Sequence, residues 1–289
     1  MKRRQVAFVL SGGGSLGAIQ VGMLKGLLEE GIRPDFLVGT SVGAVNAAWI
    51  AGRPEADGAA QLSEIWGGIK RQDIFPISPW CSARGILGQT NHVISNENLR
   101  AVLERNLLYE RLEEASIPVH VIVTELKSGE AVTLSSGPAI PALLATTAIP
   151  GVFPPVTIGR REFVDGGVAN HTPVTAAIEL GATDVYVLPV GYPYLREGPN
   201  GALGMALQAL ARIIEQRLAA EVVAHRSAAQ IRVIPAVDLP HVSPADFSRS
   251  KELIRRAYRS TRRFLGQSSP AVEASPKAFG LAAARVEAA

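Results

Sequence analysis

Residues 37–48, Leu-Val-Gly-Thr-Ser-Val-Gly-Ala-Val-Asn-Ala-Ala, constrain the fold more than any other stretch of the chain. A short apolar run leads into Gly39-x-Ser41-x-Gly43, and the small residues of a predicted helix follow. This is the strand–turn–helix context of a nucleophile elbow, in which a serine is exposed on a sharp turn. Glycines at 39 and 43 let strand and helix meet closely, because a Cβ at either position would crowd the turn. Ser41 is therefore the candidate nucleophile, at the positive end of the predicted helix.

A glycine-rich loop lies upstream of this elbow. Residues 5–10 include a short apolar run, which predicts a buried strand, and a helix is predicted over residues 18–30. Between them the chain reads Ser-Gly-Gly-Gly-Ser-Leu-Gly from position 11. Consecutive glycines let backbone N–H groups point toward an anionic oxygen at a helix entrance. The loop therefore predicts an oxyanion hole formed by Gly12, Gly13 and Gly14, with Gly17 as a further motif glycine.

The same loop also matches the dinucleotide fingerprint G-x-G-x-x-G, at Gly12, Gly14 and Gly17. A dinucleotide site needs an acidic residue at the end of the second strand, about 20 residues further on, to bind the ribose. Here the second predicted strand, 36–38, ends in the elbow, and the nearby acid Asp35 precedes that strand. An NAD(P)-dependent oxidoreductase is therefore the less favoured alternative, and we expect no cofactor.

A third motif, Asp165-Gly166-Gly167, follows a short predicted strand. Asp-Gly is a common turn dipeptide, and most examples carry no chemistry. Two glycines after an aspartate also let its carboxylate lie close to another side chain, and Asp165 is then the base that takes the proton from Ser41. His171 provides a triad alternative, because serine, aspartate and histidine follow the chain order of α/β-hydrolase triads. Its short separation from Asp165 and the Pro173 turn favour the dyad.

Taken together, these motifs resemble those of the patatin-like phospholipases, a family of serine–aspartate lipid acyl hydrolases. The resemblance includes residues 145–155 and extends over about residues 5–190. It implies a patatin-like three-layer sandwich and a Ser41–Asp165 dyad that cleaves phospholipid, lysophospholipid or acylglycerol through an acyl-serine intermediate. One departure is Ser15-Leu16, where family members often carry arginine or lysine. A catalytically inactive lipid-binding protein on the same scaffold is the alternative that this departure leaves open.

Alternation of strands and helices predicts a doubly wound α/β fold, with a mostly parallel central sheet and helices on both faces. The predicted strands are 6–10, 36–38, 119–123, 131–134, 162–164, 185–190 and 231–234, and the predicted helices between and after them are 141–147, 173–180 and 202–229. We expect one hydrolase domain over 1–266, with a helical cap-like insertion within 53–100. Residues 267–289 have few large apolar side chains, which predicts a flexible tail.

Composition sets limits on the compartment and on the kind of site. The chain has 289 residues, of which 47% are hydrophobic, so a sizeable core is expected, and its one cysteine excludes an intramolecular disulfide. The apolar run after Met1-Lys-Arg-Arg4 is too short for a signal peptide, and no stretch approaches the roughly 20 apolar residues of a membrane-spanning helix. We therefore expect a cytoplasmic protein that meets a membrane only at its surface. No metal-ligand spacing is present, so no metal is expected.

A basic amphipathic helix is predicted near the end of the domain. Ser243 and Pro244 have the form of an N-cap followed by proline at the first helical position. Apolar residues would share one face of this helix, and Arg255, Arg256 and Arg259 lie on the other. Such a helix usually packs on the fold with a solvated basic face, and the functional alternative is peripheral contact with anionic lipid. No recognition motif accompanies the arginines, so nucleic-acid binding is not expected.

Overall fold

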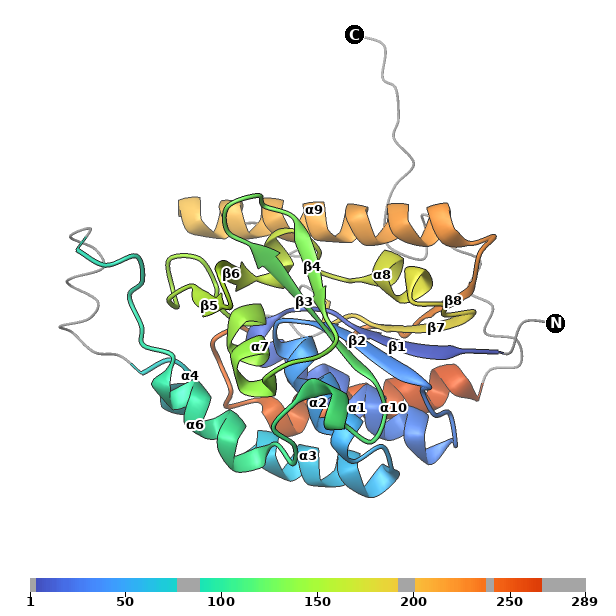
Figure 1. Ribbon diagram of the computed structural model, residues 1–289. Coiled ribbons are helices and arrows are strands. Elements are labelled where there is room, and N and C mark those ends of the chain that lie inside the picture. The colour runs from blue at the N-terminus through green and yellow to red at the C-terminus, as the bar shows by residue number, and fades with distance from the viewer. Residues whose placement is uncertain (1–3, 77–88, 192–200, 238–241, 267–289) are drawn as a thin grey trace, which may run out of the picture.

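The computed structural model describes residues 4–76, 89–191, 201–237 and 242–266 (Figure 1). At its centre lies an eight-stranded sheet in the order β5-β6-β3-β2-β1-β7-β8, with β4 beside β3. The strands are β1 (Val6–Leu10), β2 (Phe36–Thr40), β3 (Val119–Glu125), β4 (Ala131–Leu134), β5 (Val156–Ile158), β6 (Arg161–Asp165), β7 (Asp184–Leu188) and β8 (Gln230–Val233). Strands β3, β2, β1, β7 and β8 run parallel. The carboxyl ends of β1 and β2 therefore meet at one edge of the sheet, where both glycine motifs follow.

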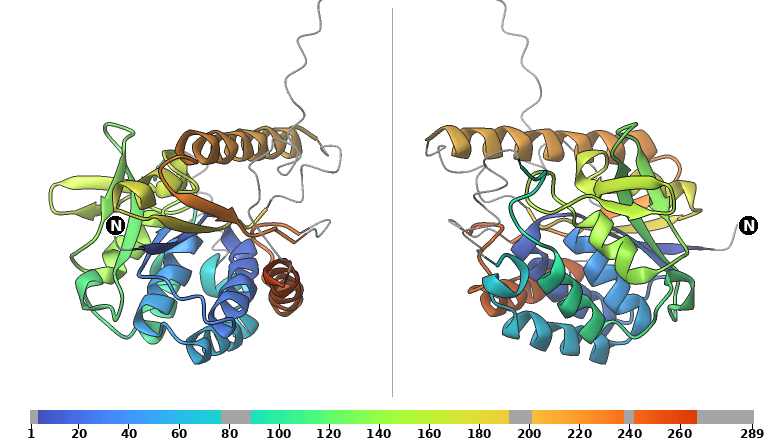
Figure 2. Two further views of the ribbon diagram at one scale, coloured as in Figure 1. Left: turned by 90° about the vertical axis from the view of Figure 1, so that its right-hand side faces the viewer. Right: turned by 60° about the vertical axis from the view of Figure 1, so that its left-hand side comes forward.

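Helices cover both faces of the sheet, as Figures 1 and 2 show. On one face lie α1 (Gly17–Glu29), α2 (Val42–Gly52), α3 (Ala56–Gly68) and α10 (Ser250–Leu265), and on the other α8 (Val174–Glu179) and α9 (Gly201–His225). The remaining helices are α4 (Arg71–Ile74), α6 (Glu97–Asn106) and α7 (Ala139–Thr146). The expectation of a three-layer α/β architecture is confirmed.

The alternation of side chains along β1 explains why two apolar cores form. Phe8 and Leu10 are fully buried against α1, α2 and α10, whereas Ala7 and Val9 are fully buried in a second cluster with residues of α8 and α9. Successive strand residues point to opposite faces, so a strand covered on both sides reads as a continuous apolar run. The sequence of β1 therefore requires a helical layer on each face.

Helix α10 packs against α1 along a line of small residues. A Cβ at Gly22 of α1 would lie 2.3 Å from the carbonyl oxygen of Ile254, so only glycine allows this approach. On α10, Ile254, Ala257 and Thr261 are buried, as the amphipathic pattern predicts. The prediction that this helix begins at Pro244 is wrong, because it begins at Ser250. The carbonyls of Ser243 and Pro244 instead accept hydrogen bonds from Ser15, which ties this segment to the glycine loop.

The sheet is mixed at one edge, within the mostly parallel arrangement that was predicted. Strands β4 and β6 both run antiparallel to β3. Only a short turn, with Gly129 at a φ of 74°, separates β3 from β4, whereas parallel neighbours need a crossover connection. Strand β5, which pairs with β6, is a short strand that the sequence pattern did not predict.

The tail expected to be flexible over 267–289 lies outside the described ranges, and so does the one cysteine of the chain, Cys81. Within the described residues, no helix combines the length and the apolar character that crossing a membrane requires.

Candidate active site

Ser41 stands at the junction between β2 and α2, in a backbone conformation that few residues adopt. Its φ is 53° and its ψ is −129°, and no other non-glycine residue in the described ranges has a positive φ. The neighbouring glycines make this turn feasible. A Cβ at Gly39 would lie 2.5 Å from Ala44 Cα, and one at Gly43 would lie 2.4 Å from the carbonyl oxygens of Leu10 and Ser11. The elbow geometry expected from the spacing is therefore present, with strain held at a single serine.

Asp165 reaches Ser41 through the register of three strands. Thr40, the last residue of β2, pairs with Ile122 of β3, and Val123 pairs with Asp165 at the end of β6. Because paired strands lie about 5 Å apart, this register brings the ends of β2 and β6 to the same place. Ser41 Oγ donates a hydrogen bond to Asp165 Oδ2 at 2.7 Å, and both residues are buried. Strand pairing in the sheet therefore brings together two residues that lie far apart in the sequence.

Backbone and threonine donors hold the two residues in position. The N–H of Gly167 donates to Asp165 Oδ1 at 2.7 Å, and Thr124 Oγ1 donates to the carbonyl of Asp165 at 2.9 Å. Thr146 Oγ1 accepts from the N–H of Ser41 at 2.8 Å and donates to the carbonyl of Ile122. No role was predicted for these threonines from the sequence. The signal was present for Thr146, since it belongs to the segment 145–155 that the family resemblance included.

Burial changes the acidity of the candidate base. The pKa of Asp165 is raised from 3.8 to about 6, chiefly because burial disfavours the charged carboxylate. The hydrogen bonds from Ser41 and from the Gly167 N–H oppose this shift, because they stabilise the charged form. A carboxylate with a higher pKa is a stronger base, so the site improves an intrinsically weak proton acceptor.

The glycine loop lies beside Ser41 and exposes part of its backbone. A Cβ at Gly12 would lie 3.4 Å from Ser41 Cβ, and Gly13 and Gly14 adopt φ values of 150° and 59°. The N–H of Gly12 already donates to the carbonyl of His171 at 3.1 Å. No hydrogen bond between described residues uses the N–H of Gly13 or Gly14. Of the three predicted oxyanion donors, Gly13 and Gly14 are therefore available, whereas the N–H of Gly12 is used by the hydrogen bond to His171.

Ser15 and Leu16, which stand where family members often carry arginine or lysine, help to fix the glycine loop in place. Both side chains are buried, and Ser15 donates through its N–H to the carbonyl of Pro244 at 2.7 Å and through Oγ to that of Ser243 at 3.0 Å. The loop is thereby fastened to the segment before α10. Neither residue provides a cation for a substrate phosphate.

His171 and Asp35, the residues of the alternative interpretations, take no part in the Ser41–Asp165 hydrogen bond, and neither does His120 of β3. His171 packs beneath Gly12, and its pKa is lowered to about 4 by burial and, to a smaller extent, by the positive charge of Arg217. His120 contacts Ser135 Oγ at 2.7 Å, and burial lowers its pKa as well. Asp35 accepts from the N–H of Val6 at 2.7 Å, at the start of β1 and β2. It therefore lies at the edge opposite the glycine loop, away from where a ribose would bind.

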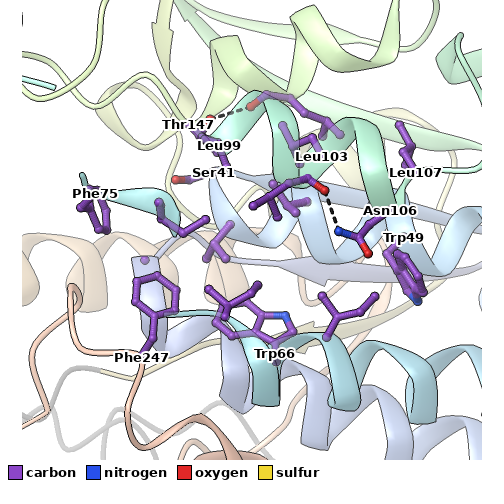
Figure 3. A pocket seen from close by; sticks show the side chains of 18 of the residues that line it. Ser41, Trp49, Trp66, Phe75, Leu99, Leu103, Asn106, Leu107, Thr147 and Phe247 are labelled. Atoms are coloured by element: carbon purple, nitrogen blue, oxygen red, sulfur yellow. Dashed lines mark hydrogen bonds between the residues drawn. The ribbon is translucent and has the colours of Figure 1, made fainter. Parts of the chain in front are cut away.

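An apolar cavity opens beside Ser41 (Figure 3). It holds about 110 Å³, measured as the space open to the centre of a water-sized sphere. Four aromatic rings contribute to its lining: Trp66 stacks on Phe247, Phe75 stacks on Phe153, and Phe75 and Phe247 contact each other at a tilted angle. The wall comes from α2, α3, α6 and α7 and includes Val42, Val45, Trp49, Leu62, Ile65, Leu99, Val102, Leu103, Asn106, Leu107 and Leu143. Helices α3 and α4 and the start of α6 lie in the region expected to form a cap-like insertion.

Comparisons with known proteins identify sequence relatives. A family model described as "Patatin-like phospholipase" matches residues 8–178. An uncharacterized NTE family protein of Mycobacterium tuberculosis is 29% identical over 171 residues, which cover 59% of this chain and 27% of that protein. The lysophospholipase NTE1 of Mycosarcoma maydis is 26% identical over 191 residues, or 64% of this chain and 10% of the relative. The chain thus matches about a quarter or less of the length of these two relatives.

Among solved structures, VipD from Legionella pneumophila superposes with a TM-score of 0.49 at 15% sequence identity, covering 91% of this chain and 67% of that one.

Proposed function

Because the chain belongs to the patatin-like phospholipase family, we propose that it is a lipid acyl hydrolase in which Ser41 is the nucleophile and Asp165 the general base. The observation that carries this proposal is the 2.7 Å hydrogen bond between Ser41 Oγ and Asp165 Oδ2 beside an apolar cavity. The family is one of lipid hydrolases, which agrees with a cavity large enough for methylene groups and poor in polar side chains.

The arrangement supports a two-step acyl transfer. Ser41 Oγ attacks the ester carbonyl carbon while its proton passes to Asp165. The N–H groups of Gly13 and Gly14 stabilise the negative carbonyl oxygen of the tetrahedral intermediate. Asp165 then gives the proton to the leaving alcohol, and an acyl-serine remains. Water, losing a proton to Asp165, attacks this ester, and the fatty acid leaves as the proton returns to Ser41 Oγ.

The apolar cavity orients the substrate relative to Ser41. An acyl chain that enters the cavity brings its carbonyl carbon to Ser41, whereas a charged head group remains outside. Phospholipid, lysophospholipid and acylglycerol share this acyl ester and are all substrates of the proposed class. A catalytically inactive lipid-binding protein, the alternative kept from the sequence, would leave the Ser41–Asp165 bond without a role.

The pH dependence of ester hydrolysis tests the assignment of the base. Asp165 must be ionised to accept a proton, so kcat/KM should fall as the pH decreases through about 6. The measurement is a pH–rate profile with a soluble p-nitrophenyl ester, whose chemistry does not depend on a lipid interface. A profile that stays flat down to pH 4.5 would exclude Asp165 as the base.

Substitution of His171 by alanine separates the dyad from a triad. The Ser41 hydroxyl donates to Asp165 directly, so we expect His171→Ala to keep kcat/KM within roughly tenfold of the wild type. A histidine acting as general base would instead contribute about 10²–10⁴-fold. The variant is compared with the wild type on the same p-nitrophenyl ester, with circular dichroism as a check on folding. A loss equal to that of the Ser41 and Asp165 variants would establish a triad.

We further propose that the protein contacts membranes through the basic face of α10. Arg256 is paired with Glu252 at 2.7 Å, whereas Arg255 and Arg259 form no ion pair with another described residue. Each arginine near an anionic bilayer contributes about fivefold to binding. Arg255→Glu combined with Arg259→Glu should therefore weaken cosedimentation with phosphatidylglycerol vesicles at least about tenfold. Arg160→Glu, at the turn between β5 and β6, is the control, and equal binding of all three proteins would exclude this face.

A further inference from the structure

The cavity beside Ser41 is elongated and follows the axis of α2. Its lining includes Val42, Val45 and Trp49, which lie on one face of that helix at successive turns. The separation of eight positions between Ser41 and Trp49 corresponds to about 12 Å along the helix. Figure 3 shows Ser41 and Phe75 toward one end of the cavity and Trp49, Asn106 and Leu107 toward the other. An acyl chain attached to Ser41 would therefore run along α2, toward α3 and α6.

A second hollow lies on the outer side of α3, α4 and α6. It holds about 430 Å³ by the same measure, and its rim includes Glu64, Asp73 and Arg105. Charged side chains such as these are solvated, so we expect water in this hollow and not in the apolar cavity. Methylene groups that reach it would remain in contact with water.

Four residues line both hollows: Ile65, Ile69, Val102 and Asn106. These shared residues form a partition between the two hollows, with two residues from α3 and its C-terminal end and two from α6. All four are half-buried, which agrees with side chains that face an apolar space on one side and solvent on the other. The inner cavity and the outer hollow therefore share this wall.

We infer that this partition sets the length of the acyl chain that the enzyme accepts, with Val102 as a specificity-determining residue. The inference rests on the proposed function, since it concerns the chain of the ester that Ser41 attacks. Each methylene placed in the apolar cavity should strengthen binding by roughly fourfold, whereas one forced into the hydrated hollow gains little. The efficiency kcat/KM should therefore rise with chain length until the chain meets the partition, and then level off or fall.

Removing two methyl groups from the partition tests this inference. Val102→Ala should open a passage between the cavity and the outer hollow, so that longer chains fit without strain. The assay measures kcat/KM for p-nitrophenyl esters from butyrate to palmitate at one fixed detergent concentration. We expect the ratio for palmitate over octanoate to rise about tenfold, because single methylene changes in apolar pockets have effects of this order. The value for butyrate should change little.

Two further variants make the result interpretable. Val132→Ala, on β4 away from the cavity, loses the same two methyl groups and should leave the chain-length profile unchanged. Ile69→Ala opens the partition from the other side, and it replaces Val102→Ala if that variant does not fold. An unchanged profile in a folded, active Val102→Ala or Ile69→Ala variant overturns the inference alone. A wild-type protein that hydrolyses no ester in the series overturns the proposed function and the inference with it.

Discussion

Ser41→Ala is expected to reduce ester hydrolysis by at least about 10⁴-fold, because no other group can form the acyl intermediate. The alanine variant keeps the backbone of the elbow and the apolar cavity, so its affinity for a lipid should be nearly unchanged. The measurement pairs kcat/KM on a p-nitrophenyl ester with binding of a fluorescent fatty acid. A variant that binds lipid and retains activity within 100-fold of the wild type would show that Ser41 is not the nucleophile.

A glycine at the same position separates chemistry from backbone strain. Both Ser41→Ala and Ser41→Gly lose the hydroxyl and its bond to Asp165, so they should be equally inactive. They differ in how they tolerate a φ of 53° with a ψ of −129°, which glycine adopts readily and alanine does not. We expect the glycine variant to be more stable by about 1–3 kcal/mol in urea unfolding. Equal stabilities would mean that the elbow stores no strain.

Asp165→Asn should have the second largest effect, a loss of about 10²–10⁴-fold in kcat/KM. The asparagine amide has nearly the shape of the carboxylate and can still form hydrogen bonds with Ser41 and with the Gly167 N–H. It cannot accept a proton at neutral pH, so geometry is kept while the base is removed. Rates on the same soluble ester provide the measurement. A variant as active as the wild type would mean that a different group accepts the Ser41 proton.

The same variant should alter the pH dependence of stability. Asp165 has a pKa of about 6 when folded, above its ordinary value of 3.8, so the folded state holds the proton more tightly than the unfolded state. The wild type should therefore lose stability relative to Asp165→Asn as the pH rises from about 4 to about 6, and the difference should stay constant above that range. Urea unfolding of both proteins at pH 4.5 and 7.5 measures it. A difference independent of pH would contradict the raised pKa.

Local patterns in the sequence were enough to predict most elements and to select Ser41 and Asp165 as a pair, which the structure places in contact. Glycine spacing around Ser41 reflects contacts within a few residues, and the apolar run of β1 reflects burial on both faces. These features depend on neighbouring residues, so they leave a local signal. The aspartate motif predicted Asp165 as the partner of Ser41, and the structure places the two side chains 2.7 Å apart.

Features that depend on distant residues were not predictable in the same way. The hydrogen bond from Ser41 to Thr146 joins residues that adjoin only because β2 lies beside β3. The start of α10 at Ser250 depends on the contacts of the preceding segment with Ser15, which no helix-capping rule includes. Strands β4 and β6 run antiparallel because each of them pairs with β3, and this pairing joins separate segments of the chain. The partition between the two hollows likewise requires α3 and α6 to be placed together.

Labelling with a fluorophosphonate, which reacts covalently with activated serines, tests the central claim most directly. We expect one adduct per chain on the peptide that contains Ser41, with little or no adduct on that peptide in Asp165→Ala. Mass spectrometry of the intact protein and of its peptides provides both results. Adduct formation on another residue, or labelling of Ser41 that is unchanged without Asp165, would contradict a Ser41–Asp165 dyad.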